Sequence, residues 1–417
     1  RVISMIAPDG LKGDAWQAWQ HWQECGETVL YQDGAIADAD VVVDALLGTG
    51  LSREVEGDWK LAIKAVNESG IPVVSVDIAS GLNADTGAIQ GAAINASRTV
   101  SFIGLKKGMF TGSGKACCGD ISFDRLGLPE QVYDSVEADA VLLSECSQWS
   151  LPPRRHDIHK GSNGHVLIVG GNFGMPGAVI LAARAALRAG AGLVSVVTRP
   201  DHLNAVAAAC PECMVHGSTN GEISQALMDK ADYIAIGCGL GQDAWAQRLL
   251  YEALDSTIPM VVDADALNLM AARDYLGLTE GCIITPHPGE ASRCLNLRKR
   301  DVQRDRYAAA HLLKQKCSAH VVLKGSGTII QQQGRPRVCA LGNPAMATAG
   351  MGDVLTGMVA SIAAQQTVIG GDLERAVISA VCLHARAGDL AANGDDRGMI
   401  ATDVIEHIRA AARCGKA

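Results

Sequence analysis

Two series of short, β-branched segments alternate with helix-forming stretches along this chain, and no other feature of the sequence restricts the fold as strongly. Such segments, each followed by glycine or a polar turn, are typical of strands buried on both faces of a parallel sheet. Because parallel strands need long crossover connections, the alternation predicts an α/β fold with helices on both faces of each sheet. In the first series we predict a crossover helix at 58–69 and strands at residues 41–43, 73–76 and 99–103. The second series is longer, with strands predicted at residues 165–169, 193–197, 233–236, 260–262, 283–284 and 321–323.

The length of 417 residues predicts two domains, because a single hydrophobic core rarely grows that large. Between the two series, the stretch 144–161 carries two prolines and two arginines at 152–155, a composition that favours an extended linker. We therefore predict domains at 1–140 and 141–417. The chain begins with Arg1 and a predicted strand follows at once, so we expect the start of the first domain to be missing.

The composition excludes two classes of partner and points to a compartment. The net charge of −9 argues against a nucleic-acid surface, which relies on clustered lysine and arginine. No apolar run approaches the roughly 18 residues that a membrane span needs. Thirteen cysteines are scattered without the dense spacing of a secreted disulfide scaffold, so we expect a reducing compartment, the cytoplasm. The single CxxC at 210–213 lacks a second pair, and we favour a structural role for it over zinc binding.

A glycine turn that runs directly into an apolar helix-forming stretch, at 349–357, is the sharpest chemical signal in the sequence. Gly350 and Gly352 let backbone N–H groups approach an anion closely, and the helix start adds partial positive charge where a phosphate would lie. Asp353, beside that position, could accept the proton of a hydroxyl group that attacks a terminal phosphoryl group. The alternative is an ordinary helix start with an acidic residue in its first turn.

Three further loops at predicted strand ends carry groups suited to ligand binding. Lys324 is followed by flexible glycines and hydroxyl groups up to Thr328, although the spacing is not that of a Walker A loop. His287 lies between two prolines, a rigid position that favours ligand contact over core packing. The glycines at 237–241 follow a strand where open α/β sheets bind ligands, but this repeat alone is a weak signal.

Together with residues 159–164 and 170–178, these motifs resemble the ADP- or ATP-dependent NAD(P)H-hydrate dehydratase family over residues 145–415. The resemblance implies a ribokinase-like fold. It also implies that the hydrated nicotinamide cofactor contacts Ala178, Gly241, His287 and Asp353. For the nucleotide, it implies binding by Lys324, Gly325, Ser326, Gly327, Thr328 and Gly352. Cys238 stands where the family usually has proline, which changes the rigidity of the loop but removes no charged group.

The first domain carries motifs at 44–54 and 76–83 that resemble the NAD(P)H-hydrate epimerase family. This resemblance implies a Rossmann-like three-layer domain in which Asp77 is catalytic, while Asp44 and Ser80 hold a potassium ion. Substrate contacts are implied for Gly48, Thr49, Gly50, Leu51, Ser52, Arg53, Glu54 and Asp77.

Residue type and position alone also indicate a possible function for two aspartates of this first domain. Asp44 and Asp77 are carboxylates at neighbouring strand ends, where one could move a proton during epimerisation; turn capping is the alternative. Two departures from the family pattern are visible. Ala79 replaces a usual proline, and the loop rich in asparagine and glycine near the family's N-terminus is absent.

The pairing of both families in one chain is similar to the bifunctional bacterial NAD(P)H-hydrate repair enzymes. It implies epimerisation of R- and S-NAD(P)HX and dehydration of the S epimer at the expense of ADP, which leaves as AMP and phosphate. Magnesium at the nucleotide and potassium in the epimerase are the implied ions. The partners we expect are NADHX, NADPHX, ADP and further copies of this chain. Two alternatives stay open, a ribokinase-like kinase for a vitamin precursor and an inactive nucleotide-binding regulator.

Overall fold

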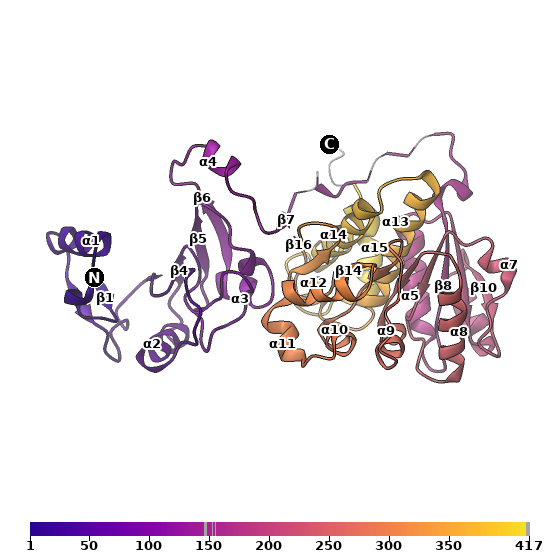
Figure 1. The fold of residues 1–417 in the computed structure, drawn as a ribbon, viewed down its shortest axis with the longest axis horizontal. Helices are drawn as coiled ribbons and strands as arrows, with labels where there is room; N and C mark the ends of the chain where they lie inside the picture. The colour runs from indigo at the N-terminus through magenta and orange to yellow at the C-terminus, as the bar shows by residue number, and fades with distance from the viewer. Residues whose placement is uncertain (146–147, 152, 155, 414–417) are drawn as a thin grey trace. The chain divides into compact units, whose positions relative to one another are not determined.

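The computed structural model describes residues 1–145, 148–151, 153–154 and 156–413. It divides into two compact units, Arg1–Ala138 and Asp139–Ala417 (Figure 1). Pro152 and Arg155 of the predicted linker lie outside the described residues. None of the helices in the described ranges is long and apolar enough to cross a membrane.

The first unit is built on a parallel four-stranded sheet in which the strands lie side by side in chain order. These strands are β3 (Val42–Asp44), β4 (Val73–Val76), β5 (Arg98–Phe102) and β6 (Asp120–Asp124). Helix α2 (Gly57–Glu68) connects β3 to β4 and buries its apolar side on the unit's core. Predicted and observed bounds agree to about one residue. Edge strand β6 was not predicted, because its residues are mostly exposed and lack an apolar run.

Smaller elements complete the first unit. Strands β1 (Val2–Ser4) and β2 (Thr28–Leu30) form a separate parallel pair. The remaining α-helices are α1 (Asp14–Gln23), α3 (Gly114–Cys118) and α4 (Gln131–Asp134).

A ten-stranded sheet forms the centre of the second unit, in the order β10-β9-β8-β11-β12-β13-β14-β15-β16-β7. Neighbours from β10 to β14 are parallel, β15 is antiparallel to both of its neighbours, and β7 is parallel to β16. The six predicted strands are present as β8 (His165–Val169), β9 (Leu193–Thr198), β11 (Tyr233–Ile236), β12 (Met260–Val262), β13 (Ile283–Ile284) and β14 (His320–Leu323). Four more strands were not predicted: β7 (Val141–Leu143), β10 (Met214–Gly217), β15 (Thr328–Gln331) and β16 (Arg337–Cys339).

Helices cover the sheet of the second unit in two groups (Figure 1). One group packs together as α5 (Pro176–Ala189), α13 (Met351–Ile369), α14 (Leu373–Ala392) and α15 (Ala401–Ala411). The other contains α9 (Ala264–Ala271), α10 (Pro288–Leu295), α11 (Lys299–Arg304) and α12 (Arg306–Lys316). The remaining helices are α6 (Leu203–Ala209), α7 (Gln225–Met228) and α8 (Ala244–Asp255). The predicted α/β fold is confirmed.

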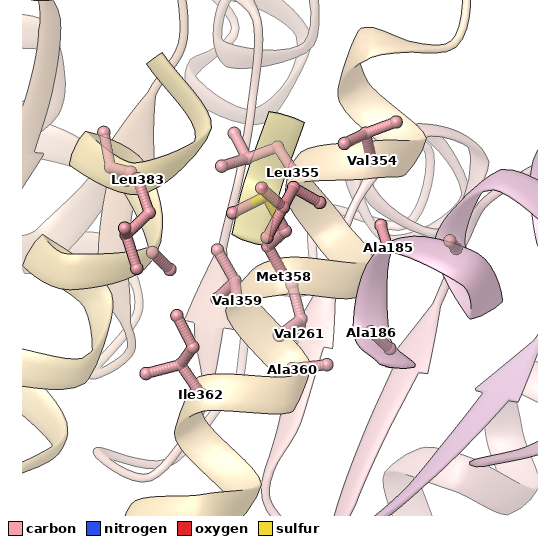
Figure 2. Close-up of a cluster of buried hydrophobic side chains, with 14 of the residues drawn as sticks. Ala185, Ala186, Val261, Val354, Leu355, Met358, Val359, Ala360, Ile362 and Leu383 are labelled. Atoms are coloured by element: carbon pink, nitrogen blue, oxygen red, sulfur yellow. The ribbon is translucent and has the colours of Figure 1, made fainter. Parts of the chain in front are cut away.

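Helix α13 is the central helix of the second unit. Every residue from Val354 to Ala364 is buried, so this helix is apolar on all sides, as expected of a helix enclosed by the core. Figure 2 shows its side chains between α5 and α14, with Val261 of β12 beside them. Its approach to α5 requires Gly357, where a Cβ atom would lie 2.0 Å from the carbonyl oxygen of Ala182. Because the helix is held so firmly, its first turn is a rigid support for functional groups.

Candidate active sites

The sheet of the second unit has a topological switch point between β8 and β11. From β8 the chain proceeds to β9 and β10 on one side, and it returns to add β11 on the other side. In open parallel sheets, ligands bind in the crevice at the carboxyl ends of the strands that flank such a point. The loops that follow these two strands, 170–175 and 237–243, therefore mark the predicted position of a ligand.

These two loops are joined by backbone hydrogen bonds. The Gly171 N–H donates to the Cys238 carbonyl (3.1 Å), and the Asn172 N–H donates to the Gly239 carbonyl (2.7 Å). The Gly241 N–H donates to the Asp265 carboxylate (2.8 Å), and a Cβ atom at Gly241 would meet the Asn172 amide nitrogen at 2.6 Å.

The predicted substrate residue Ala178 lies in the same cluster of loops. Its Cβ atom lies 3.0 Å from the position that a Cβ atom of Gly239 would take. The structure thus brings Ala178 and the loop of Gly241 together at the switch point.

A buried ion pair lies at the centre of the site. The Lys324 ammonium is 2.6 Å from the Asp263 carboxylate and 3.9 Å from that of Glu290, and the Thr356 hydroxyl donates to Asp263 (2.7 Å). The side chains of Lys324 and Asp263 are 18% and 2% exposed. Burial lowers the pKa of Lys324, but the charges of Asp263 and Glu290 outweigh it and raise that pKa overall. The lysine therefore stays charged between two carboxylates.

Sequence reasoning missed three members of this network, Asp263, Glu290 and Thr356. Asp263 follows the predicted strand at 260–262, and this strand-end position was the signal that could have found it. The residue after it, Ala264, has a φ of 46°, a left-handed conformation that is unusual for a residue with a side chain. Such strain is concentrated at functional sites, where surrounding structure enforces it.

Asp353 lies in the first turn of α13, directly after the glycine turn. Gly350 has a φ of 87°, and a Cβ atom on Gly352 would lie 3.4 Å from the Lys324 ammonium. Burial raises the pKa of Asp353 to about 6; a hydrogen bond from the Cys238 thiol opposes that rise, and the charge of Asp263 adds to it. A carboxyl group that titrates close to neutral pH is suited to general base catalysis.

His287 is placed at this site, but it also has a structural role. Its Nδ1 accepts hydrogen bonds from the Gly289 N–H (2.9 Å) and the Glu290 N–H (3.3 Å), so it caps α10. Its Nε2 lies 3.1 Å from the Glu290 carboxylate, and burial together with the charge of Lys324 lowers the pKa of the ring. Because Nδ1 accepts and Nε2 faces a carboxylate, the imidazole is a neutral Nε2–H tautomer whose side chain remains about half exposed.

The loop of Gly325, Ser326 and Gly327 connects β14 to β15 and is supported from inside by Arg306. This fully buried guanidinium donates to the carbonyl oxygens of Leu323 (3.2 Å), Lys324 (3.2 Å) and Gly327 (3.4 Å). Burial lowers the pKa of Arg306 to about 10. Sequence reasoning missed this arginine, which lies on α12 and outside every motif.

In the first unit, Asp44 and Ser80 are brought together at the end of β3. The Asp44 carboxylate, 1% exposed, accepts hydrogen bonds from the Ser75 hydroxyl (2.7 Å), the Ser80 N–H (2.9 Å) and the Leu46 N–H (3.3 Å). All three donors are neutral. A buried carboxylate with neutral partners is suited to a hard cation that offsets its charge.

Asp77 lies one strand away from Asp44, at the end of β4. Its φ is 69°, and its carboxylate accepts hydrogen bonds from the Phe102 N–H (3.0 Å) and from the Lys106 ammonium. Lys106 also donates to the Ser101 hydroxyl (3.1 Å). Sequence reasoning missed Lys106, which supplies a cation beside the predicted proton carrier.

The predicted substrate segment of this unit surrounds a hollow of about 290 Å³. It is lined by Leu46, Leu47, Gly48, Gly50, Leu51, Ser52 and Arg53. Among the substrate residues predicted in this segment, Thr49 and Glu54 do not line it.

Two family models match the chain in succession. The model described as "YjeF-related protein N-terminus" matches residues 1–108, and the model described as "NAD(P)H-hydrate dehydratase" matches residues 166–410. The bifunctional NAD(P)H-hydrate repair enzyme Nnr of Coxiella burnetii is 43% identical over 96% of this chain and 81% of its own length. The enzyme of the same name from Escherichia coli is 39% identical over 89% of this chain and 71% of its own.

Solved structures agree with the ribokinase-like fold of the second unit. A ribokinase-like superfamily protein from Enterococcus faecalis is 30% identical, with a TM-score of 0.60, and the match covers 67% of this chain and 97% of that protein. The ADP/ATP-dependent NAD(P)H-hydrate dehydratase of Bacillus subtilis, co-crystallised with ATP and Mg²⁺, is 27% identical with a TM-score of 0.55. That match covers 63% of this chain and 94% of the dehydratase.

Proposed function

The chain belongs to the bifunctional NAD(P)H-hydrate repair enzymes, and from that membership we propose that it returns hydrated NADH and NADPH to their active forms. The second unit is an ADP-dependent dehydratase, a lyase, and the first is an epimerase, an isomerase. The observation that carries the proposal is the position of Asp353, with a pKa of about 6, beside the Lys324–Asp263 ion pair at the start of α13.

In the dehydratase reaction, Asp353 takes the proton of the ring hydroxyl as that oxygen attacks the terminal phosphorus of ADP. The bond to the leaving AMP breaks, and the hydroxyl becomes a phosphate ester. Phosphate then leaves with the C–O bond electrons, the neighbouring ring carbon loses a proton to solvent, and the electrons of that C–H bond restore the nicotinamide double bond. The N–H groups at the start of α13 and the Lys324 ammonium stabilise the charge on the phosphoryl oxygens.

Gly352 and the loop of Lys324, Gly325, Ser326, Gly327 and Thr328 would bind the nucleotide, whereas Ala178, Gly241 and His287 would contact the hydrate. Magnesium would offset the charge between the phosphates of ADP. We find no group of three histidine, cysteine or acidic side chains arranged for a metal in the part of the chain that the structure describes. Asp263 and Glu290 supply two carboxylates, and magnesium sites of this kind are completed by phosphate oxygens and water.

In the first unit, Asp77 moves a proton during interconversion of the R and S epimers, and the Lys106 ammonium contacts its carboxylate. The hollow next to Gly48, Gly50, Ser52 and Arg53 would receive the substrate, with Thr49, Leu51 and Glu54 in the same segment. Asp44 and Ser80 would hold potassium, which would offset the buried negative charge of Asp44.

The setting we propose is the cytoplasm, with the chain assembled as a homo-oligomer. None of the cysteines in the described ranges forms a disulfide, and nine of these cysteines are buried in their units, consistent with a reducing compartment. Homo-oligomerisation stays a prediction.

One assay tests the proposed function together with the division of labour between the units. Incubation of the protein with S-NADHX, ADP and Mg²⁺ should regenerate NADH absorbance, and R-NADHX should be consumed through its epimer. A kinase would instead accumulate a phosphorylated product, and an inactive regulator would change neither.

Substitution of Asp77 by asparagine should slow conversion of R to S about 10²- to 10⁴-fold, because the proton carrier is lost. Asparagine tolerates the positive φ of this position, so the fold should be retained. Dehydration of S-NADHX should stay at the parent rate. Impaired turnover of the S epimer in this variant would contradict the independence of the two units.

The raised pKa of Asp353 predicts the pH dependence of dehydration. The base is active when ionised, so turnover of S-NADHX at saturating ADP should fall as the pH drops through about 6, with a slope of one proton. An aspartate with its ordinary pKa would hold its rate to about pH 4. The measurement is kcat between pH 5 and pH 8 in a buffer of constant ionic strength, and a flat profile over that range would refute the assignment.

A further inference from the structure

An aromatic side chain is held at the rim of the switch point with most of its surface exposed. Phe173 follows Asn172 in the loop after β8, and its side chain is 60% exposed. It is the single phenylalanine of the second unit. The Arg199 guanidinium lies over the ring at 4.4 Å from its centroid, and the His202 ring meets it edge-on at 6.3 Å. A single exposed aromatic ring is ordinary, but one that neighbouring side chains hold in position offers a face on which a planar ligand can stack.

The Arg199 guanidinium that packs against Phe173 is itself held by contacts with three other side chains. The Arg199 side chain is 11% exposed and also lies 4.2 Å from the centroid of the Trp245 ring. It donates to the Asn172 amide oxygen (2.9 Å) and to the Asp243 carboxylate (2.8 Å). The position of Phe173 is therefore set by the framework rather than by its own burial. This is the preorganisation that a stacking platform requires.

The same framework connects Phe173 to the proposed hydrate site. The amide oxygen of Asn172 accepts a hydrogen bond from the Phe173 N–H (2.9 Å), and its amide nitrogen donates to the Leu240 carbonyl (3.0 Å). Leu240 precedes Gly241, one of the residues proposed to contact the hydrate. Phe173 thus lies on the same connected loops as the proposed hydrate contacts.

The chemistry of the hydrate indicates which group would reach this ring. The dihydronicotinamide ring of NADH and NADPH is not aromatic, and hydration saturates it further by adding a tetrahedral carbon that carries a hydroxyl. Adenine is then the aromatic ring that remains in NADHX and NADPHX. A purine stacks on an exposed aromatic side chain through its π-face.

The second substrate, ADP, also carries adenine, but the strand order separates its site from Phe173. The loop of Phe173 follows β8, whereas Lys324 follows β14, and β11, β12 and β13 lie between them. Four intervals of about 4.8 Å place the two strand ends roughly 19 Å apart. We therefore expect the loop after Lys324 to lie near the adenine of ADP and the loop of Phe173 to lie near the adenine of the hydrate.

We propose that Phe173 is the adenine platform of the dinucleotide hydrate, stacking on the base through the ring face that Arg199 leaves open. The proposal rests on the dehydratase function and deepens it, because it assigns the part of the substrate far from the reacting carbon. It makes Phe173 a specificity residue that distinguishes dinucleotides from mononucleotides.

The test compares two product ligands on three variants of the full-length protein. Calorimetric titration measures the Kd of NADH and of reduced nicotinamide mononucleotide, which lacks the adenosine half. In Phe173→Ala, the Kd of NADH should rise about 5- to 150-fold, the range that base–aromatic stacking gives on alanine substitution. The Kd of the mononucleotide should stay at the parent value, and Phe173→Tyr should retain parent affinity for both ligands.

A matched control is Tyr251→Ala, since Tyr251 on α8 is also an exposed aromatic (41%) next to an arginine, with Arg273 at 4.5 Å from the ring centroid. It should change neither Kd. Steady-state assays of Phe173→Ala with S-NADHX should show a raised KM for the hydrate, an unchanged KM for ADP and a parent kcat.

Three results would overturn the proposal. Equal weakening of both product ligands would show that Phe173 supports the site rather than the adenine. If Phe173→Ala raised the KM for ADP alone, the ring would contact the nucleotide instead of the hydrate. If this variant bound NADH with parent affinity, the ring would make no contribution to binding. Failure of the parent protein to dehydrate NADHX would instead refute the proposed function, and this outcome is read independently of Phe173.

Discussion

Replacement of Asp353 by asparagine is expected to reduce dehydration of S-NADHX about 10²- to 10⁴-fold while ADP affinity stays within a few-fold of the parent. The amide is nearly isosteric with the carboxyl group but cannot accept a proton. The N–H groups of the first turn of α13 and the Lys324 ammonium remain in place, so ground-state binding of phosphate is preserved. Single-turnover kinetics and calorimetric titration of ADP measure the two quantities separately.

Stability provides an internal control for this variant. The folded-state pKa of Asp353 is about 6, above the ordinary value of 3.8. An acid whose pKa is raised by folding binds a proton more tightly in the folded state, so stability falls as the pH rises from about 4 to about 6. Asparagine removes this penalty. The variant should therefore be at least as stable as the parent at pH 7, and this difference should vanish near pH 4.

The alternative reading of Asp353, an ordinary acidic residue at a helix start, has its own control. Asp372 caps α14 and accepts hydrogen bonds from the N–H groups of Glu374 and Arg375. Asp372→Asn should retain parent turnover. If Asp353→Asn also turned over S-NADHX at a near-parent rate, its role as the base would have to be abandoned.

The parts of the fold that could be predicted are those with a local signature in the sequence. The buried parallel strands appear in the sequence as runs of β-branched residues, because both faces of such strands are covered. Strand β16 (Arg337–Cys339) is too short to form such a run, and β7 (Val141–Leu143) pairs with it although almost two hundred residues separate them. Pairing over that distance depends on the order of the strands, which no local window of sequence contains.

The site shows the same division between local and long-range information. The glycine turn before Asp353 and the loop after Lys324 have local signatures, since close backbone approach to phosphate needs glycine. The residue that pairs with Lys324 has no such local signature. Asp263 is 61 positions away, and it meets the lysine because β12, β13 and β14 are neighbours in the sheet. Arg306 and Lys106 were missed for the same reason, as each is recognisable only by the groups that it contacts.

The buried position of Lys324 enlarges the effect expected from removing it. Lys324→Ala would leave Asp263 and Glu290, which are 2% and 5% exposed, as two carboxylates without their common cation. Breaking a buried pair in this way costs about 3–5 kcal/mol, because the remaining charge is uncompensated. We expect a loss of that order in the free energy of unfolding of the second unit, measured by urea denaturation at pH 8.

The exposed pair between Arg248 and Glu222 is a control for loss of charge alone. These side chains are 53% and 55% exposed, and exposed pairs contribute about 0.2–1 kcal/mol. Arg248→Ala should therefore change the same free energy far less than Lys324→Ala does.

The pH dependence of the Lys324→Ala defect follows from its cause. Burial raises the pKa of Glu290 and the charge of Lys324 opposes that rise, so removal of the lysine should raise this pKa further. The penalty is then present above the unfolded pKa of Glu290 and is lost as the pH falls. The difference between parent and variant should thus shrink from pH 8 to pH 4.5. The double variant Lys324→Ala/Asp263→Asn should recover part of the stability at pH 8, since one of the two charges is gone. A defect that is independent of pH and unaffected by Asp263→Asn would point to lost packing of the lysine stem instead.

Nucleotide binding separates the structural role of Lys324 from its proposed role as a phosphate ligand. A lost charge-assisted contact is worth about 1.5–3 kcal/mol, or roughly ten- to over a hundredfold in the Kd of ADP. The double variant is the suitable protein for this titration, because it should recover part of the stability without restoring the ammonium. If it bound ADP as tightly as Asp263→Asn alone, Lys324 would serve only to hold the acidic pair, and the N–H groups at the start of α13 would be the main phosphate anchor. A Kd raised by the predicted factor would place the ammonium on the phosphate once ADP is bound, with Asp263 as the group that holds it there beforehand.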